Sequence, residues 1–89
     1  MKQRKPFLEK LDLLEEARPK QPLVEVCGYS RVIVENHKGV LEYGRERISA
    51  RVGFGAIRIE GTELLLRKMC GQQLVITGNI ASIRLEKEV

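Results

Sequence analysis

The sequence predicts a mainly β protein: a small antiparallel β-sandwich or barrel-like domain of about eight short strands, with one N-terminal amphipathic helix. From Leu23 onward, apolar and polar residues alternate with a period of two, which is typical of half-buried strands. Glycine-containing polar clusters interrupt this alternation and predict turns. Aromatic residues make up only 4% of the chain, so the core must be built from Val, Ile and Leu.

Length and charge limit the classes of protein to consider. The 89 residues are enough for a single domain with one small core, and a core of that size makes self-association a reasonable expectation. The net charge is +4, but basic and acidic residues interleave along the whole chain. Spread charge of this kind favours solubility over a nucleic-acid footprint. A small basic nucleic-acid-binding β domain is therefore the alternative function, and we do not expect it.

Residues 1–22 are predicted to form a basic N-terminal arm. Pro6 suits the first turn of a helix, and the two prolines of the 18–22 linker end it. Two interpretations of this helix stay open: it covers a face or edge of its own sheet, or it docks on a partner or a membrane surface. The residues that would make this contact recur at helical spacing, and they are Phe7, Leu8, Leu11 and Leu14.

Residues 23–89 are predicted to form the all-β domain. The segments 31–35 and 40–43 are expected to pair as a hairpin around the polar residues 36–39. Near the C-terminus, Ile80 and Ile83 have opposite parity, which predicts a β-bulge or bend between them. The expected strands are 23–27, 31–35, 40–43, 47–52, 55–60, 64–69, 74–77 and a last run that ends at Leu85.

Two strand segments echo each other within this domain. The sequence Ile-Arg-Ile-Glu-Gly at 57–61 resembles Leu-Val-Ile-Thr-Gly at 74–78, 17 positions later. Two copies are too few for a solenoid, in which at least three stacked repeats are expected.

The residues of the chain do not form a recognisable catalytic or metal-binding pattern. His37 is the only histidine, and general-base catalysis needs a positioned partner beside it. Cys27 and Cys70 are 43 positions apart and belong to no C-x-x-C motif. We therefore expect no enzyme activity, no metal and no bound cofactor.

Neither a secretory signal nor a transmembrane span is recognisable in the sequence. No apolar run reaches the roughly 20 residues that cross a bilayer. A cytoplasmic protein with reduced thiols is therefore expected.

The segment 36–39 is the candidate interaction or turn motif. Asn36 and Gly39 are residue types that tolerate the backbone conformations of tight turns, and His37 can cap such a turn. Lys38 completes the motif. Its structural interpretation is a polar turn, and its functional interpretation is a small contact site for a partner.

The residues from Val34 to Tyr43 read Val-Glu-Asn-His-Lys-Gly-Val-Leu-Glu-Tyr. Together with a basic alternating strand at 47–52, a G-x-I-x-I-x-G-like strand at 55–61 and the ending at 76–85, they make the chain similar to the YabP/YqfC family of sporulation proteins. The YqfC branch is the nearest in pattern. The resemblance extends over roughly residues 23–86.

This resemblance implies a role in endospore formation, in the mother cell of a spore-forming bacterium. It suggests a non-catalytic protein–protein interaction or assembly module in spore envelope morphogenesis. A YqfD-like sporulation membrane protein is the implied partner, and the chain would then be peripheral at the forespore membrane. The resemblance provides no catalytic residues.

Overall fold

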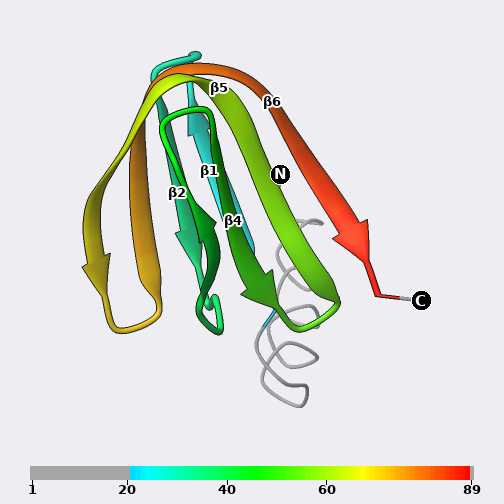
Figure 1. The fold of residues 1–89 in the computed structure, drawn as a ribbon. Coiled ribbons are helices and arrows are strands. Elements are labelled where there is room, and N and C mark those ends of the chain that lie inside the picture. The colour runs from blue at the N-terminus through cyan, green and yellow to red at the C-terminus, as the bar shows by residue number, and fades with distance from the viewer. Residues whose placement is uncertain (1–20, 89) are drawn as a thin grey trace, which may run out of the picture.

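The structure is a computed structural model that describes residues 21–88. It contains one antiparallel sheet of six strands with the spatial order β1-β2-β6-β5-β4-β3 (Figure 1). The four short strands have the bounds expected from the period-two pattern, and the mainly β prediction is confirmed. The strands are β1 (Leu23–Cys27), β2 (Arg31–Glu35), β3 (Val40–Tyr43), β4 (Arg47–Val52), β5 (Gly55–Cys70) and β6 (Gln73–Lys87).

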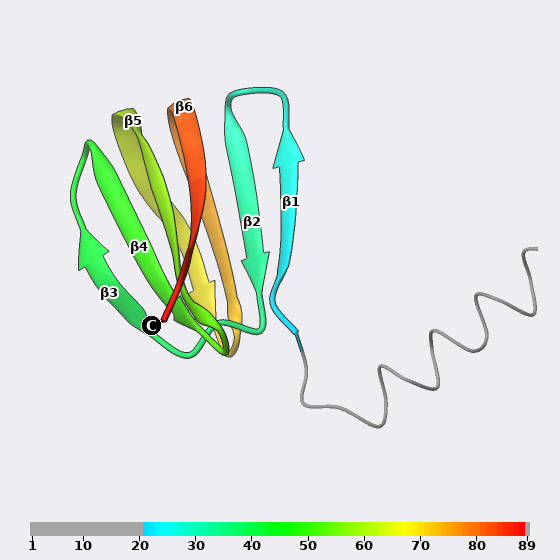
Figure 2. The same ribbon diagram turned by 90° about the vertical axis from the view of Figure 1, so that its right-hand side faces the viewer.

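The single sheet folds over into two facing layers because its two long central strands bend sharply (Figures 1 and 2). In the front layer, β3 and β4 continue into the 55–60 half of β5 and the 82–87 half of β6. In the back layer, β1 and β2 continue into the 73–77 half of β6 and the 65–70 half of β5. We call the bend between these halves the crease.

The hydrophobic core lies between the two layers. Period-two alternation places every second residue of a strand on the inner face, where branched aliphatic side chains pack well. The side chains that are buried here agree with that alternation on β2, on β4 and on the halves of β5 and β6 that border them. They are Val32, Val34, Ile48, Ala50, Val52, Ile57, Ile59, Leu64, Leu74 and Ile76.

Glycine lets the long strands bend at the crease. Gly61 lies on β5 and Gly78 on β6, and a Cβ added to either residue would collide with the backbone of the other strand. The ladder also shifts register here: Glu60 pairs with Ser82, whereas Gly61 pairs with Ile80. The β-bulge predicted between Ile80 and Ile83 is therefore confirmed.

The two layers are built from equivalent segments. In the back layer Val32 pairs with Ile76, and in the front layer Ile48 pairs with Ile59. Val32 and Ile48 are 16 positions apart in the sequence, and Ile59 and Ile76 are 17 positions apart. The echo between 57–61 and 74–78 thus marks the two strands that lead into the crease, one in each layer.

The same equivalence extends to the hairpin turns that meet the crease. The backbone N–H of Gly61 donates to the carbonyl of Glu46 in the β3–β4 turn at 3.1 Å. The N–H of Gly78 donates to the carbonyl of Ser30 in the β1–β2 turn at 3.2 Å. Each hairpin turn therefore forms a hydrogen bond with one of the two bent strands. Because the two layers are equivalent in these contacts, the domain has an approximate internal twofold symmetry.

Two sequence predictions need correction. The expected strands 55–60 and 64–69 are the two halves of β5, and the last two expected strands are the halves of β6. The count is six rather than eight because glycine allows the paired strands to bend without ending. The expected pairing of 31–35 with 40–43 is also wrong, since β2 pairs with β1 and β6, and β3 pairs with β4.

The predicted N-terminal helix, with Phe7, Leu8, Leu11 and Leu14, lies outside the described residues. The part of the chain that the structure describes contains no helix of the length and apolar character that crosses a bilayer.

Candidate functional site

The segment 36–39 is a crossover that carries the chain from the back layer to the front layer. The N–H of Lys38 donates to the carbonyl of Arg51 at 2.7 Å, and the N–H of Arg51 donates to the carbonyl of Gly39 at 2.8 Å. Asn36 has φ 66° and Gly39 has φ 132°. These positive angles explain the choice of Asn and Gly, although the segment joins two layers instead of closing a hairpin.

The side chain of His37 is buried between the layers, with 6% of its surface exposed. Its Nδ1 accepts a hydrogen bond from the N–H of Gly39 at 2.9 Å, which is the capping bond expected from the sequence. Because Nδ1 is the acceptor, the neutral ring carries its proton on Nε2. Nε2 is buried and has no hydrogen-bond partner among residues 21–88.

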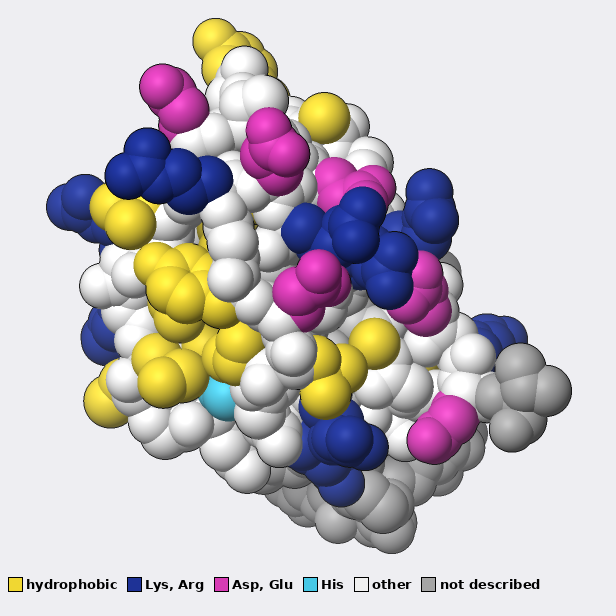
Figure 3. Space-filling model, viewed as in Figure 1, with side chains coloured by type: hydrophobic (Ala, Val, Ile, Leu, Met, Phe, Trp, Pro, Cys, Tyr) yellow, Lys and Arg dark blue, Asp and Glu magenta, His cyan; other side chains and the backbone are white. Residues whose placement is uncertain are grey.

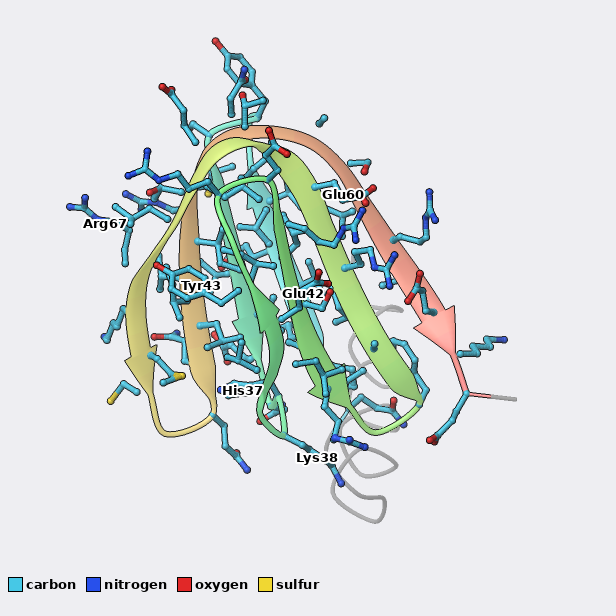
Figure 4. All side chains as sticks on the ribbon, viewed as in Figure 1. His37, Lys38, Glu42, Tyr43, Glu60 and Arg67 are labelled. Atoms are coloured by element: carbon cyan, nitrogen blue, oxygen red, sulfur yellow. The ribbon has the colours of Figure 1, made fainter. Side chains whose placement is uncertain are left out.

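Asn36 is half-buried and Lys38 is exposed, in contrast to the buried His37. The side-chain Nδ2 of Asn36 donates to the carbonyl of Gln21 at 2.8 Å, two residues before β1 begins. Lys38 is exposed and points away from the layers, whereas His37 lies between them (Figure 4). The structure therefore does not bring the four residues together as one contact site: His37 points inward and Lys38 outward.

The two layers leave an open side next to His37, which we call the β3–β5 side. Tyr43 of β3 is 57% exposed and Met69 of β5 is 61% exposed. Tyr43 pairs with Ile48 and Met69 pairs with Leu74, and both of these ladder partners are fully buried. Tyr43 and Met69 therefore continue the inner faces of their layers beyond the covered core. Figure 3 shows a cluster of hydrophobic side chains in this region, with the cyan His37 at its margin.

Sequence reasoning did not identify Tyr43 or Met69 as site residues. Tyr43 has the opposite parity to Val40, and Met69 the opposite parity to Leu66, so strict alternation does not place them on the inner face. Register shifts between Val40 and Glu42 and between Leu66 and Lys68 turn both side chains inward. Exposure depends on which strands form the edges of the layers, and this depends on the long-range pairing.

The outer face of the front layer carries ion pairs. Arg47 contacts Glu60 at 3.1 Å and Glu42 at 3.6 Å. Arg58 contacts Glu86 at 3.5 Å. Because these side chains are partly exposed, solvent screens the attraction, and each pair stabilises the fold only slightly.

The outer face of the back layer differs from this charged face. Ile33 and Val75 occupy the places that correspond to Ser49 and Arg58 of the front layer, and both are partly buried. The internal symmetry therefore holds for the core and is lost on the outer faces.

Cys27 and Cys70 are both exposed and form no disulfide. Within residues 21–88, His, Cys, Asp and Glu side chains do not gather in groups of three or more that could hold a metal ion.

The family model described as the YabP family matches residues 19–89. This range includes every described strand and the 36–39 crossover. No curated protein and no solved structure matches the chain.

Proposed function

The chain belongs to the YabP family, and on that premise we propose that it is a non-catalytic protein-binding module of endospore formation. Membership of this family indicates a sporulation-related protein. The proposal adds a molecular role, which is to bind another protein through the β3–β5 side.

The observation that carries this role is the combination of Tyr43, Met69 and His37 on one side of the molecule. Tyrosine and methionine are enriched at protein interfaces, where they contribute large contact areas. The Nε2–H of His37 is a buried donor with no acceptor among residues 21–88, and a buried donor without an acceptor is unfavourable. A partner would contact Tyr43 and Met69 directly, and it would reach this donor only if the layers opened beside it.

The strand edge beside these residues supports the same role. The 65–70 half of β5 extends past β4, so one edge of its backbone is not paired with another described strand. A short extended peptide can add to such an edge on one side of the register shift between Leu66 and Lys68, through main-chain hydrogen bonds, and pockets for its side chains then give specificity.

The proposed setting is the mother-cell side of the developing spore, in spore envelope morphogenesis. A YqfD-like sporulation membrane protein is the proposed partner, and it would hold the chain at the forespore membrane. The resemblance in the 34–43 segment supports this setting.

The test replaces the chromosomal copy of the gene in the spore-forming bacterium that encodes the chain. The variants are Tyr43→Lys, Met69→Lys and, as a matched control, Tyr29→Lys in the exposed β1–β2 turn. We expect the first two to reduce the yield of heat-resistant spores at unchanged protein level, and Tyr29→Lys to leave it unchanged. Normal sporulation in all three strains would contradict the proposed role of this side.

The nucleic-acid alternative has its own test. The purified chain is titrated against duplex and single-stranded oligonucleotides over a range of ionic strengths. Binding at low salt that weakens steeply as salt rises would favour this alternative, because phosphate contacts release counterions.

A further inference from the structure

We propose that two copies of this chain form a closed twofold dimer in which β1 of each copy pairs with the 82–87 half of β6 of the other. This contact uses the side opposite the β3–β5 side, and we call it the β1–β6 side. The inference goes beyond the proposed function and does not depend on it, because a dimer can exist whatever the β3–β5 side binds.

The first support is the regularity of the two strand edges on this side. β1 pairs with β2 over five residues without a register shift, and it contains no Lys or Arg. The 82–87 half of β6 also pairs with β5 without a shift. Regular edges are templates for further strand pairing.

The edges of the β3–β5 side are less suited to strand pairing with a second copy. The ladder of β3 shifts register between Val40 and Glu42. The ladder of β5 shifts between Leu66 and Lys68, where Arg67 and Lys68 also bring two adjacent positive charges to the edge. Bulges protect an edge against self-association, and they are the feature that distinguishes the two sides, because the 82–87 half of β6 also carries basic residues, Arg84 and Lys87.

The second support is the exposure of large apolar side chains that face the inside of the layers. Val26 is 51% exposed although its ladder partner Val32 is fully buried. Leu85 is 62% exposed although its ladder partner Ile57 is fully buried. Figure 2 shows this side, between the red half of β6 and the cyan β1. A second copy placed here would extend both inner faces into one core.

The third support is the direction of the strands. β1 and the 73–77 half of β6 are both antiparallel to β2, so both run toward the crease. After the crease, the 82–87 half of β6 runs away from it. A twofold axis parallel to the strands therefore places β1 of one copy antiparallel to the 82–87 half of the other, at two symmetric places at once. Such an isologous contact closes and cannot extend into a filament.

The internal symmetry of the domain sets the register of these ladders. Val26 and Ile76 both pair with Val32 of β2, so they lie at the same position along the back layer. In the front layer Ile83 pairs with Ile59. Ile76 and Ile59 are equivalent positions of the two layers, so Val26 of one copy meets Ile83 of the other. The full set of cross-copy pairs is Leu23–Glu86, Val24–Leu85, Glu25–Arg84, Val26–Ile83 and Cys27–Ser82.

This register brings opposite charges together. Glu25 and Arg84 are both exposed, both point to the outer face, and neither forms an ion pair with another described residue. Arg84 pairs across the ladder with Arg58, a like charge, which is unfavourable. In the dimer Glu25 of the second copy lies on the other flank of Arg84, and the twofold axis creates this contact twice.

The central test is a charge swap in the full chain, followed by sedimentation equilibrium. We expect the wild type to dimerise, and Glu25→Arg and Arg84→Glu each to raise the dimer dissociation constant by about tenfold or more, since two symmetric pairs become repulsive. The double variant Glu25→Arg/Arg84→Glu is expected to restore dimerisation. Both residues are exposed and face outward, so the changes leave the core intact.

Matched apolar variants identify the side that is used. Val26→Lys and Leu85→Lys are expected to yield monomers. Their equivalents on the β3–β5 side are Tyr43→Lys and Met69→Lys, and these are expected to remain dimeric. If Tyr43→Lys and Met69→Lys abolished dimerisation while Val26→Lys and Leu85→Lys did not, the proposal would be overturned.

A disulfide tests the register directly. On a Cys70→Ser background, Ser82→Cys is expected to form a covalent dimer with the native Cys27 under mild oxidation, because directly opposed residues of an antiparallel ladder lie within disulfide distance. Cys27→Ser on the same background removes the bridge and is the control. A wild type that stays monomeric at high concentration would refute the dimer.

Discussion

Gly61 and Gly78 occupy equivalent places in the crease, and each lies against the backbone of the opposite strand. A Cβ on Gly61 would collide with the carbonyl oxygen of Asn79, and a Cβ on Gly78 would lie 2.6 Å from the carbonyl oxygen of Glu63. The absence of a side chain at both places lets β5 and β6 cross closely while they stay paired. The sandwich depends on this relationship, since both layers are halves of the same two strands.

Alanine at either crease glycine is expected to destabilise the fold. Gly61→Ala and Gly78→Ala should each lower the free energy of unfolding by about 2 kcal/mol or more, because the clash is with backbone that cannot move without breaking the ladder. Gly53→Ala is the control, since a Cβ there meets nothing within 4 Å. Urea denaturation monitored by circular dichroism measures the effect. Equal midpoints for Gly61→Ala and Gly53→Ala would contradict the crease.

The two layers are expected to unfold together. Ile59 and Ile76 are equivalent and fully buried, one in each layer. Ile59→Val and Ile76→Val should each cost about 1 kcal/mol, since each removes one buried methyl group. A single urea transition should remain in both variants, because β5 and β6 run through both layers. A biphasic transition in only one variant would show that the layers are independent.

The imidazole of His37 is expected to contribute to stability. His37→Ala should lower the free energy of unfolding by about 2 kcal/mol, since it opens space between the layers and removes the acceptor of the Gly39 N–H. Lys38→Ala is the matched control, because Lys38 is exposed and its structural bond is made by the backbone. Thermal denaturation of the wild type and of the two variants measures the loss of stability that each substitution causes. A smaller loss in His37→Ala than in Lys38→Ala would argue against the buried position.

The outer ion pairs are expected to matter little. Arg47→Met should change the free energy of unfolding by no more than about 0.5 kcal/mol, because its side chain is half exposed and salt screens its pairs with Glu42 and Glu60. Arg31→Met, at the equivalent place in the back layer, is the control without an ion pair to a described residue. Urea midpoints at low and high ionic strength compare the two. A large, salt-independent loss in Arg47→Met would contradict this expectation.

The sequence was sufficient to predict the β class, the bounds of the four short strands and the bulge between Ile80 and Ile83. These features are local, because alternation determines which residues face inward, and a change of parity within one strand requires an extra residue. The same information located Asn36 and Gly39 as positions of special backbone conformation.

Only the tertiary structure decided how these strands connect and which side chains remain uncovered. Glycine is compatible with a turn that ends a strand and with a bend that continues it, so the sequence does not distinguish six strands from eight. Alternation also assigns a side chain to a face without saying whether another strand covers it. The burial of His37 and the exposure of Tyr43, Met69, Val26 and Leu85 therefore follow from long-range pairing, which places β1 and β3 at the ends of the sheet.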